Sequence, residues 1–139
     1  MSGSKIFLDT NVFVYTQSKG EQDKRDIALN AIETYDCYTS VQVFNEVSNV
    51  MIKKLKMPIA EVKQIITAIN DRCTVSIITH EAVQKALDLK EVYGYSYYDS
   101  LILAAAVLSD CDYIFSEDLQ DGQIVENKTE IANIFKRSI

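Results

Sequence analysis

Short apolar runs without polar alternation predict strands that are buried on both faces. Residues 6–8 and 113–115 are two such runs, as expected for central strands of a parallel sheet. A β-branched run at residues 73–78 predicts a third strand. Shorter strands are predicted at residues 38–39 and 123–125, and residues 131–135 fit either a terminal strand or a helical turn.

Apolar residues at helical spacing predict helices between these strands. Residues 22–34 form the first, after a polar stretch that ends at Lys19-Gly20-Glu21. Capping residues delimit the others: Ser40 begins a helix to about residue 55, Pro58 one to about 70, Thr79 one to 93 before Gly94, and Ser96 one through the apolar run 101–108. Strands separated by helices predict an α/β fold, a three-layer α/β/α sandwich with a central, mainly parallel sheet.

Composition adds three constraints to this picture. The length of 139 residues and the ordinary apolar fraction of 47% predict one domain over residues 1–139. Three widely spaced cysteines without a C-x-x-C pair predict a reduced, cytoplasmic chain, and the longest apolar run, 101–108, is too short to span a bilayer. A net charge of −6 argues against a general nucleic-acid coat, although a nuclease with clustered carboxylates remains compatible with it.

Four carboxylates occupy positions that favour a shared site. Asp9 and Asp118 follow the two buried strands, and parallel strands bring their carboxyl ends to one edge of the sheet. Asp99 lies in the first turn of the apolar helix, where the helix dipole favours an anion. Glu46 borders the buried stripe of its helix. Together, these placements predict a cluster.

Each acid also has a purely structural interpretation. Asp9 could form a local turn after its strand, and Asp118 could cap the turn Ser116-Glu117-Asp118. Asp99 could close a capping box with Ser96, and Glu46 could be a solvated edge residue. The functional interpretation therefore depends on the four acids acting jointly.

The motifs around these acids resemble a known family along nearly the whole chain. They are Lys5-Ile6-Phe7-Leu8-Asp9-Thr10-Asn11, Phe44-Asn45-Glu46-Val47, Ser96-Tyr97-Tyr98-Asp99 with the apolar helix after it, and Ile114-Phe115-Ser116-Glu117-Asp118-Leu119-Gln120. In order and spacing they resemble the PIN-domain ribonucleases, most closely the VapC-type toxins of toxin–antitoxin pairs. The segment after Val125 departs from the usual ending.

The resemblance implies a metal-dependent endoribonuclease. It assigns catalytic and metal-binding roles to Asp9, Glu46, Asp99 and Asp118, and supporting roles to Thr10, Asn11 and Ser116. Whether Glu117 or Asp121 joins them is left open, as is the number of metal ions. The implied cofactor is Mg²⁺ or Mn²⁺, which carboxylate oxygens also favour by themselves. The only histidine, His80, lies away from every acidic motif and is predicted to be a surface residue.

Partners follow from the same resemblance. It implies an RNA substrate cleaved to a 5′-phosphate and a 3′-hydroxyl, a small antitoxin whose basic segment covers the acidic cleft, and a homodimer. Lys53, Lys54 and Lys56 could guide RNA, although a solvated helix end explains them better. Stacking of bases or ordinary packing could each explain the tyrosines at positions 93, 95, 97 and 98.

Two other functions fit parts of the sequence. The run from Ile6 to Asn11 also resembles the nucleophile strand of haloacid-dehalogenase-type phosphatases, but Asn11 stands where their second acid is expected. A PIN-like module that binds partners without catalysis is the other alternative. The presence of all four acids argues against it.

Overall fold

A six-stranded sheet forms the centre of the protein, as described by a computed structural model over residues 3–139. Its order is β3-β2-β1-β4-β6-β5, and every neighbouring pair is parallel except β5 with β6. The strands are β1 (Lys5–Leu8), β2 (Asp36–Ser40), β3 (Thr74–Ser76), β4 (Tyr113–Phe115), β5 (Ile124–Val125) and β6 (Thr129–Ala132). The predicted α/β class with a mostly parallel sheet is confirmed.

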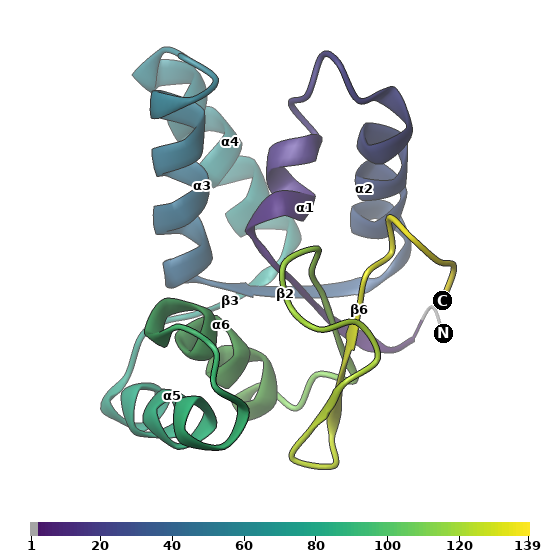
Figure 1. Ribbon diagram of the computed structural model, residues 1–139. Helices are drawn as coiled ribbons and strands as arrows, with labels where there is room; N and C mark the ends of the chain where they lie inside the picture. The colour runs from purple at the N-terminus through teal and green to yellow at the C-terminus, as the bar shows by residue number, and fades with distance from the viewer. Residues whose placement is uncertain (1–2) are drawn as a thin grey trace.

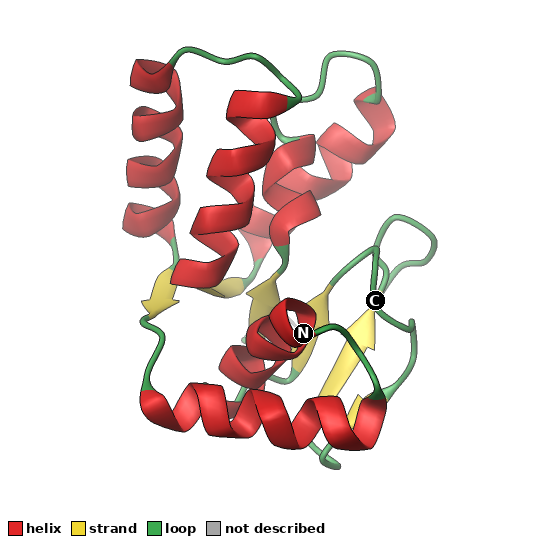
Figure 2. Cartoon of the chain, turned by 60° about the vertical axis from the view of Figure 1, so that its left-hand side comes forward, coloured by secondary structure: helices red, strands yellow, loops and turns green. Residues whose placement is uncertain are grey.

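Helices cover both faces of this sheet. They are α1 (Thr10–Tyr15), α2 (Gln22–Thr34), α3 (Val41–Lys53), α4 (Ile59–Arg72), α5 (His80–Tyr93) and α6 (Tyr97–Leu108). In Figures 1 and 2, α1 to α4 lie on one side of the strands, and α5 and α6 lie on the other. Within the described residues, no helix is both long enough and apolar enough to cross a bilayer.

The core is built on the two strands with continuous apolar runs and on helix α6. Ile6, Phe7 and Leu8 have no exposed surface, and residues 101–107 of α6 are all buried. A helix that is apolar around its whole circumference can be accommodated only between other elements. The prediction that this helix is central is therefore confirmed. All three cysteines are free and buried.

The predicted helix ends agree closely with the structure because capping residues fix them. The Ser40 hydroxyl accepts a hydrogen bond from the Val43 N–H, and the Thr79 hydroxyl accepts one from the Ala82 N–H. Gly94 ends α5 with a left-handed φ of 80°, which glycine adopts without a steric penalty.

The structure differs from the predicted elements in two places. Helix α1, from Thr10 to Tyr15, lies between the first strand and the helix at 22–34, where no helix was predicted. It has only six residues, too few to show a helical period, and the Asp9 side chain caps it. Strand β3 covers only Thr74–Ser76 of the predicted 73–78, because its single partner β2 ends at Ser40, which pairs with Ser76.

Candidate active site

Asp9 lies at the carboxyl edge of the sheet, where β1 and β4 run side by side. Its N–H donates to the Phe115 carbonyl at 3.1 Å, which continues the pairing of the two strands by one residue. Its carboxylate accepts from the Thr10 N–H at 2.7 Å and from the Ser116 hydroxyl at 2.7 Å. Asp9 therefore has a local structural role as the N-cap of α1, for which only one of its carboxylate oxygens is used.

Burial makes the Asp9 carboxylate hard to ionise. The residue is 6% exposed, and its pKa is raised from 3.8 to about 6. Loss of hydration is the main cause, and the negative charges of Glu46 and Asp118 add to it, while the bonds from Ser116 and Thr10 oppose it. A buried acid surrounded by other acids lacks a countercharge, which a bound cation would supply.

Glu46 is directed to the same edge by helix α3, which begins directly after β2. The Thr10 hydroxyl donates to Glu46 Oε1 at 2.8 Å, and Gln42 Nε2 donates to Oε2 at 3.2 Å. Glu46 is thus a half-buried, hydrogen-bonded group rather than a solvated edge residue. Gln42 was not among the predicted site residues, and its only sequence signal is its spacing of four residues before Glu46.

Asp118 lies at the exposed rim, in the segment that follows β4. Asn11 Nδ2 donates to its Oδ2 at 3.0 Å, and the Asp118 N–H donates to the Ser116 hydroxyl at 3.2 Å. Partial burial and the charges of Asp99 and Glu117 raise the pKa of Asp118, against the bond from Asn11. Ser116 therefore contacts two of the four acids, because its hydroxyl also donates to Asp9.

Asp99 approaches the cluster from the opposite layer. It lies in the first turn of α6, and its N–H donates to the Ser96 hydroxyl at 3.2 Å. Its negative charge is one cause of the raised pKa of Asp118. Asp99 is therefore both part of a helix cap and a neighbour of the site. Bonds to Thr10, Asn11 and Ser116 bring Asp9, Glu46 and Asp118 together, whereas Asp99 is linked to them only through its charge on Asp118.

The two acids left open by the sequence have other partners. Glu117 accepts from Lys24 Nζ at 2.6 Å and from the Tyr15 hydroxyl at 2.5 Å. Although partial burial acts to raise it, these bonds hold the pKa of Glu117 below its ordinary value. Asp121 accepts from the Asn133 N–H at 2.9 Å and from Arg137 Nε at 3.0 Å.

The donor set fits a hard divalent cation, although the side chains do not already form a cage. Among residues 3–139, no three acidic, cysteine or histidine side chains have the spacing of a closed metal site. The groups that converge here are carboxylates, with the hydroxyls of Thr10 and Ser116 beside them, and such oxygen ligands favour Mg²⁺ or Mn²⁺ over zinc. The raised pKa of Asp9 means that a nearby cation would favour its ionised form.

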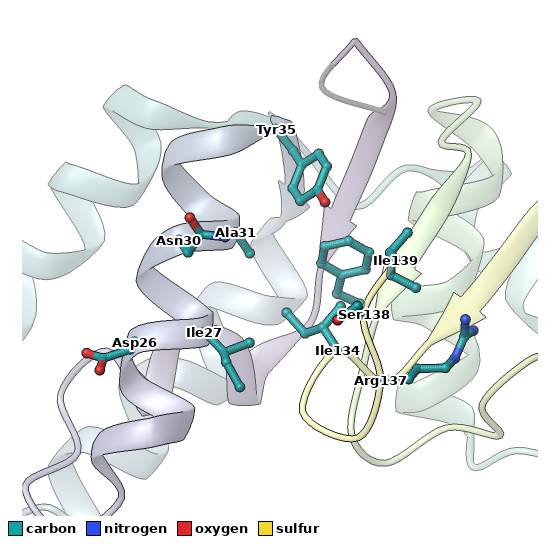
Figure 3. Close-up of a pocket in the computed structure, with 10 residues that line it drawn as sticks. Asp26, Ile27, Asn30, Ala31, Tyr35, Ile134, Arg137, Ser138 and Ile139 are labelled. Atoms are coloured by element: carbon teal, nitrogen blue, oxygen red, sulfur yellow. The ribbon is translucent and has the colours of Figure 1, made fainter.

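Other predicted features lie outside the cluster. Lys53, Lys54 and Lys56 are exposed, and so is His80, as expected. A cavity of about 420 Å³ lies between α2 and the C-terminal segment (Figure 3), where Ile27, Ile134 and Ile139 form part of its wall. None of the four acids lines this cavity, so it is separate from the candidate site.

Comparison with protein families identifies the class to which this fold and site belong. The model of the PIN domain matches residues 6–120, so the chain is a member of the PIN-domain family, a family of nucleases. This match covers all four acids and leaves the haloacid-dehalogenase alternative without support. A comparison with curated proteins found no match.

Solved structures with the same fold include VapC toxins. A toxin–antitoxin complex from Klebsiella pneumoniae has a TM-score of 0.69 at 18% identity, covering 92% of this chain and 96% of that chain. VapC20 of Mycobacterium tuberculosis, a toxin that cleaves the sarcin–ricin loop, has a TM-score of 0.68 at 16% identity, covering 81% of this chain and 91% of that chain. VapBC2 of Rickettsia felis, bound to a promoter DNA fragment, has a TM-score of 0.64 at 16% identity, covering 93% of this chain and 99% of that chain. The protein is therefore a PIN domain that resembles VapC ribonuclease toxins.

Proposed function

We propose that this protein is a divalent-metal-dependent endoribonuclease. The observation that carries the proposal is that Asp9, Glu46 and Asp118 are bonded to Thr10, Asn11 and Ser116 at one edge of the sheet, with the charge of Asp99 acting on Asp118. In a chain of the PIN-domain family, this is the arrangement expected of a nuclease site. RNA is the proposed substrate, and Mg²⁺ or Mn²⁺ the proposed cofactor.

In this proposal the acids bind the cation and the neighbouring polar groups orient them. Asp9, Glu46, Asp99 and Asp118 are the ligands, Thr10 fixes the Glu46 carboxylate, and Asn11 fixes that of Asp118. The Ser116 hydroxyl links Asp9 with Asp118, because it donates to the Asp9 carboxylate and accepts from the Asp118 N–H. When bound, a metal of this kind acidifies water and neutralises charge on the phosphodiester.

Cleavage of a defined RNA panel tests the proposal. Wild type should cut RNA with Mg²⁺ or Mn²⁺ and lose activity with a chelator, and Asp99→Asn should lose most of it because one ligand charge is gone. Unchanged cleavage in both Asp9→Asn and Asp99→Asn would instead favour a module without catalysis of its own. Absence of metal-dependent RNA cleavage by wild type would overturn the proposal.

We further propose that the protein is the toxin of a toxin–antitoxin pair and forms a homodimer. Relatives of the same fold have been crystallised in toxin–antitoxin complexes. The cluster of acids and the net charge of −6 suit a basic antitoxin segment. Size-exclusion chromatography with light scattering tests the dimer, and detection of monomer alone would contradict it. Expression of this protein with and without the product of an adjacent gene tests the pair. Growth arrest by this protein that the second protein does not relieve would contradict the pairing.

A further inference from the structure

Beside the acidic cluster, three side chains from separate parts of the chain form a compact contact, which we call the clasp: Tyr15, Lys24 and Glu117. Lys24 Nζ contacts Glu117 Oε2 at 2.6 Å and the Tyr15 hydroxyl at 3.1 Å. The Tyr15 hydroxyl donates to Glu117 Oε1 at 2.5 Å. Each member therefore contacts both of the others, and both oxygens of Glu117 are engaged.

The clasp joins the segment after β4 to helices α1 and α2. Tyr15 is the last residue of α1, and Lys24 lies in the first turn of α2. Lys24 Nζ also lies 4.8 Å from the centre of the Tyr15 ring and 5.9 Å from that of Phe135. The lysine is thereby confined on several sides, so it can hold Glu117 in one place.

Glu117 is the residue between Ser116 and Asp118, so fixing it restricts the segment that carries a proposed metal ligand. On the other side of this segment, Asn11 of α1 binds the Asp118 carboxylate. Figure 1 shows the loop after β4 next to the start of α1. Asp118 is therefore held through its own carboxylate by Asn11 and through its chain neighbour by the clasp.

We propose that Lys24 and Tyr15 are positioning residues that act through Glu117 to place Asp118 at the metal site. This inference rests on the proposed function. It also assigns Glu117 a role other than metal binding, because a turn toward the site would break two hydrogen bonds to charged or polar partners. Outer partners of this kind commonly change metal affinity or activity by about 10–100-fold when they are removed.

The alternative is that the clasp merely stabilises the fold or neutralises charge. These roles predict different signs. Removing the positive charge of Lys24 makes the region more negative, and electrostatics alone would then strengthen cation binding. Loss of positioning weakens it, because Asp118 would sample other conformations. The direction of the change in metal affinity therefore separates the two explanations.

Lys24→Met tests the proposal, and the chain offers a matched control in Lys85→Met. Lys85 pairs with Glu126 at 3.0 Å, and its partly exposed ion pair resembles that of Lys24 and Glu117 but contains none of the site residues. Mn²⁺ affinity is measured by calorimetry, kcat and KM by RNA cleavage, and stability by urea unfolding. Lys24→Arg, which keeps the charge and its donors, is the rescue variant.

Lys24→Met should weaken Mn²⁺ binding by about tenfold and lower kcat with KM little changed. Tyr15→Phe should act in the same direction, Lys24→Arg should retain wild-type affinity, and Lys85→Met should stay within about twofold. Unchanged or tighter Mn²⁺ binding in Lys24→Met would overturn the positioning role while the proposed function stands. A higher KM with unchanged kcat would assign Lys24 to RNA binding and overturn it too. If wild type binds no Mn²⁺, both proposals fail.

Discussion

The Asp9 carboxylate combines two requirements that oppose each other. As the cap of α1 it contributes to folding, because its Oδ1 accepts the Thr10 N–H. As a buried acid near Glu46 and Asp118 it opposes folding whenever it is ionised. The N-cap residue of α1 is thus also a carboxylate that a bound cation would stabilise.

The pH dependence of stability should report this conflict. The pKa of Asp9 is about 6 in the folded protein and 3.8 in the unfolded chain, so the folded state holds the proton more tightly. Stability without metal should therefore fall as the pH rises through this interval, by about 3 kcal/mol in total. Asp9→Asn removes the charge and should be more stable than wild type at pH 8 but similar at pH 4. Urea unfolding in the presence of chelator measures this, and equal stability at pH 8 would contradict it.

Thr10 offers a second test with a single side chain. Its hydroxyl, in a buried residue, donates to Glu46 Oε1 at 2.8 Å. Thr10→Val keeps the shape but removes the donor, so Glu46 should become less well oriented. We expect Mn²⁺ affinity to fall by about tenfold, since a hydrogen bond to a charged group contributes about 1.5 kcal/mol or more. Thr10→Ser keeps the donor and should bind nearly as wild type, and equal losses in both variants would exclude this role.

At the scale of elements, predictability followed the strength of local signals. Helix α2 is found at the predicted residues 22–34, and α5 ends at Gly94 as predicted. Periodicity and caps are local, so a single sequence contains them. Helix α1 was missed because its six residues make fewer than two turns, which cannot establish a period. Strand β3 was overestimated because its length depends on β2, its only partner.

Gly94 provides a prediction at this scale. Its φ of 80° ends α5, and an alanine there would be strained in the left-handed region. Gly94→Ala should lower the free energy of unfolding by about 1 kcal/mol. Gly20→Ala is the control, because Gly20 has no positive φ and open space around it. Equal unfolding midpoints for the two variants in urea would contradict the assigned turn.

At the scale of the whole molecule, the sequence predicted that Asp9 and Asp118 lie at one edge of the sheet, but not how they are held there. Asp9 and Asp118 could be placed together because parallel strands share an edge. The bond between Tyr15 and Glu117 spans 102 positions, and that between Lys24 and Glu117 spans 93. No local pattern encodes such pairs, because they arise only when the helices have packed on the sheet. The clasp was therefore visible only in the folded structure.

Metal binding should stabilise the whole molecule in proportion to site occupancy. A ligand that binds only the folded state adds about 2.7 kcal/mol at a free concentration of 100 times its Kd. Mg²⁺ should therefore raise the melting temperature of wild type progressively, and chelator should reverse the gain. Asp9→Asn combined with Asp118→Asn should lose this response, because two of the proposed ligands lose their charge.

Charge screening is the competing cause of such a gain, because the chain carries a net charge of −6. Screening depends on ionic strength and not on the identity of the cation. NaCl at matched ionic strength should thus reproduce the screening contribution in wild type and in the double variant alike. If NaCl stabilised wild type as much as Mg²⁺ does, the gain would belong to the general acidity of the protein, and the carboxylate cluster would lose its support as a specific cation site.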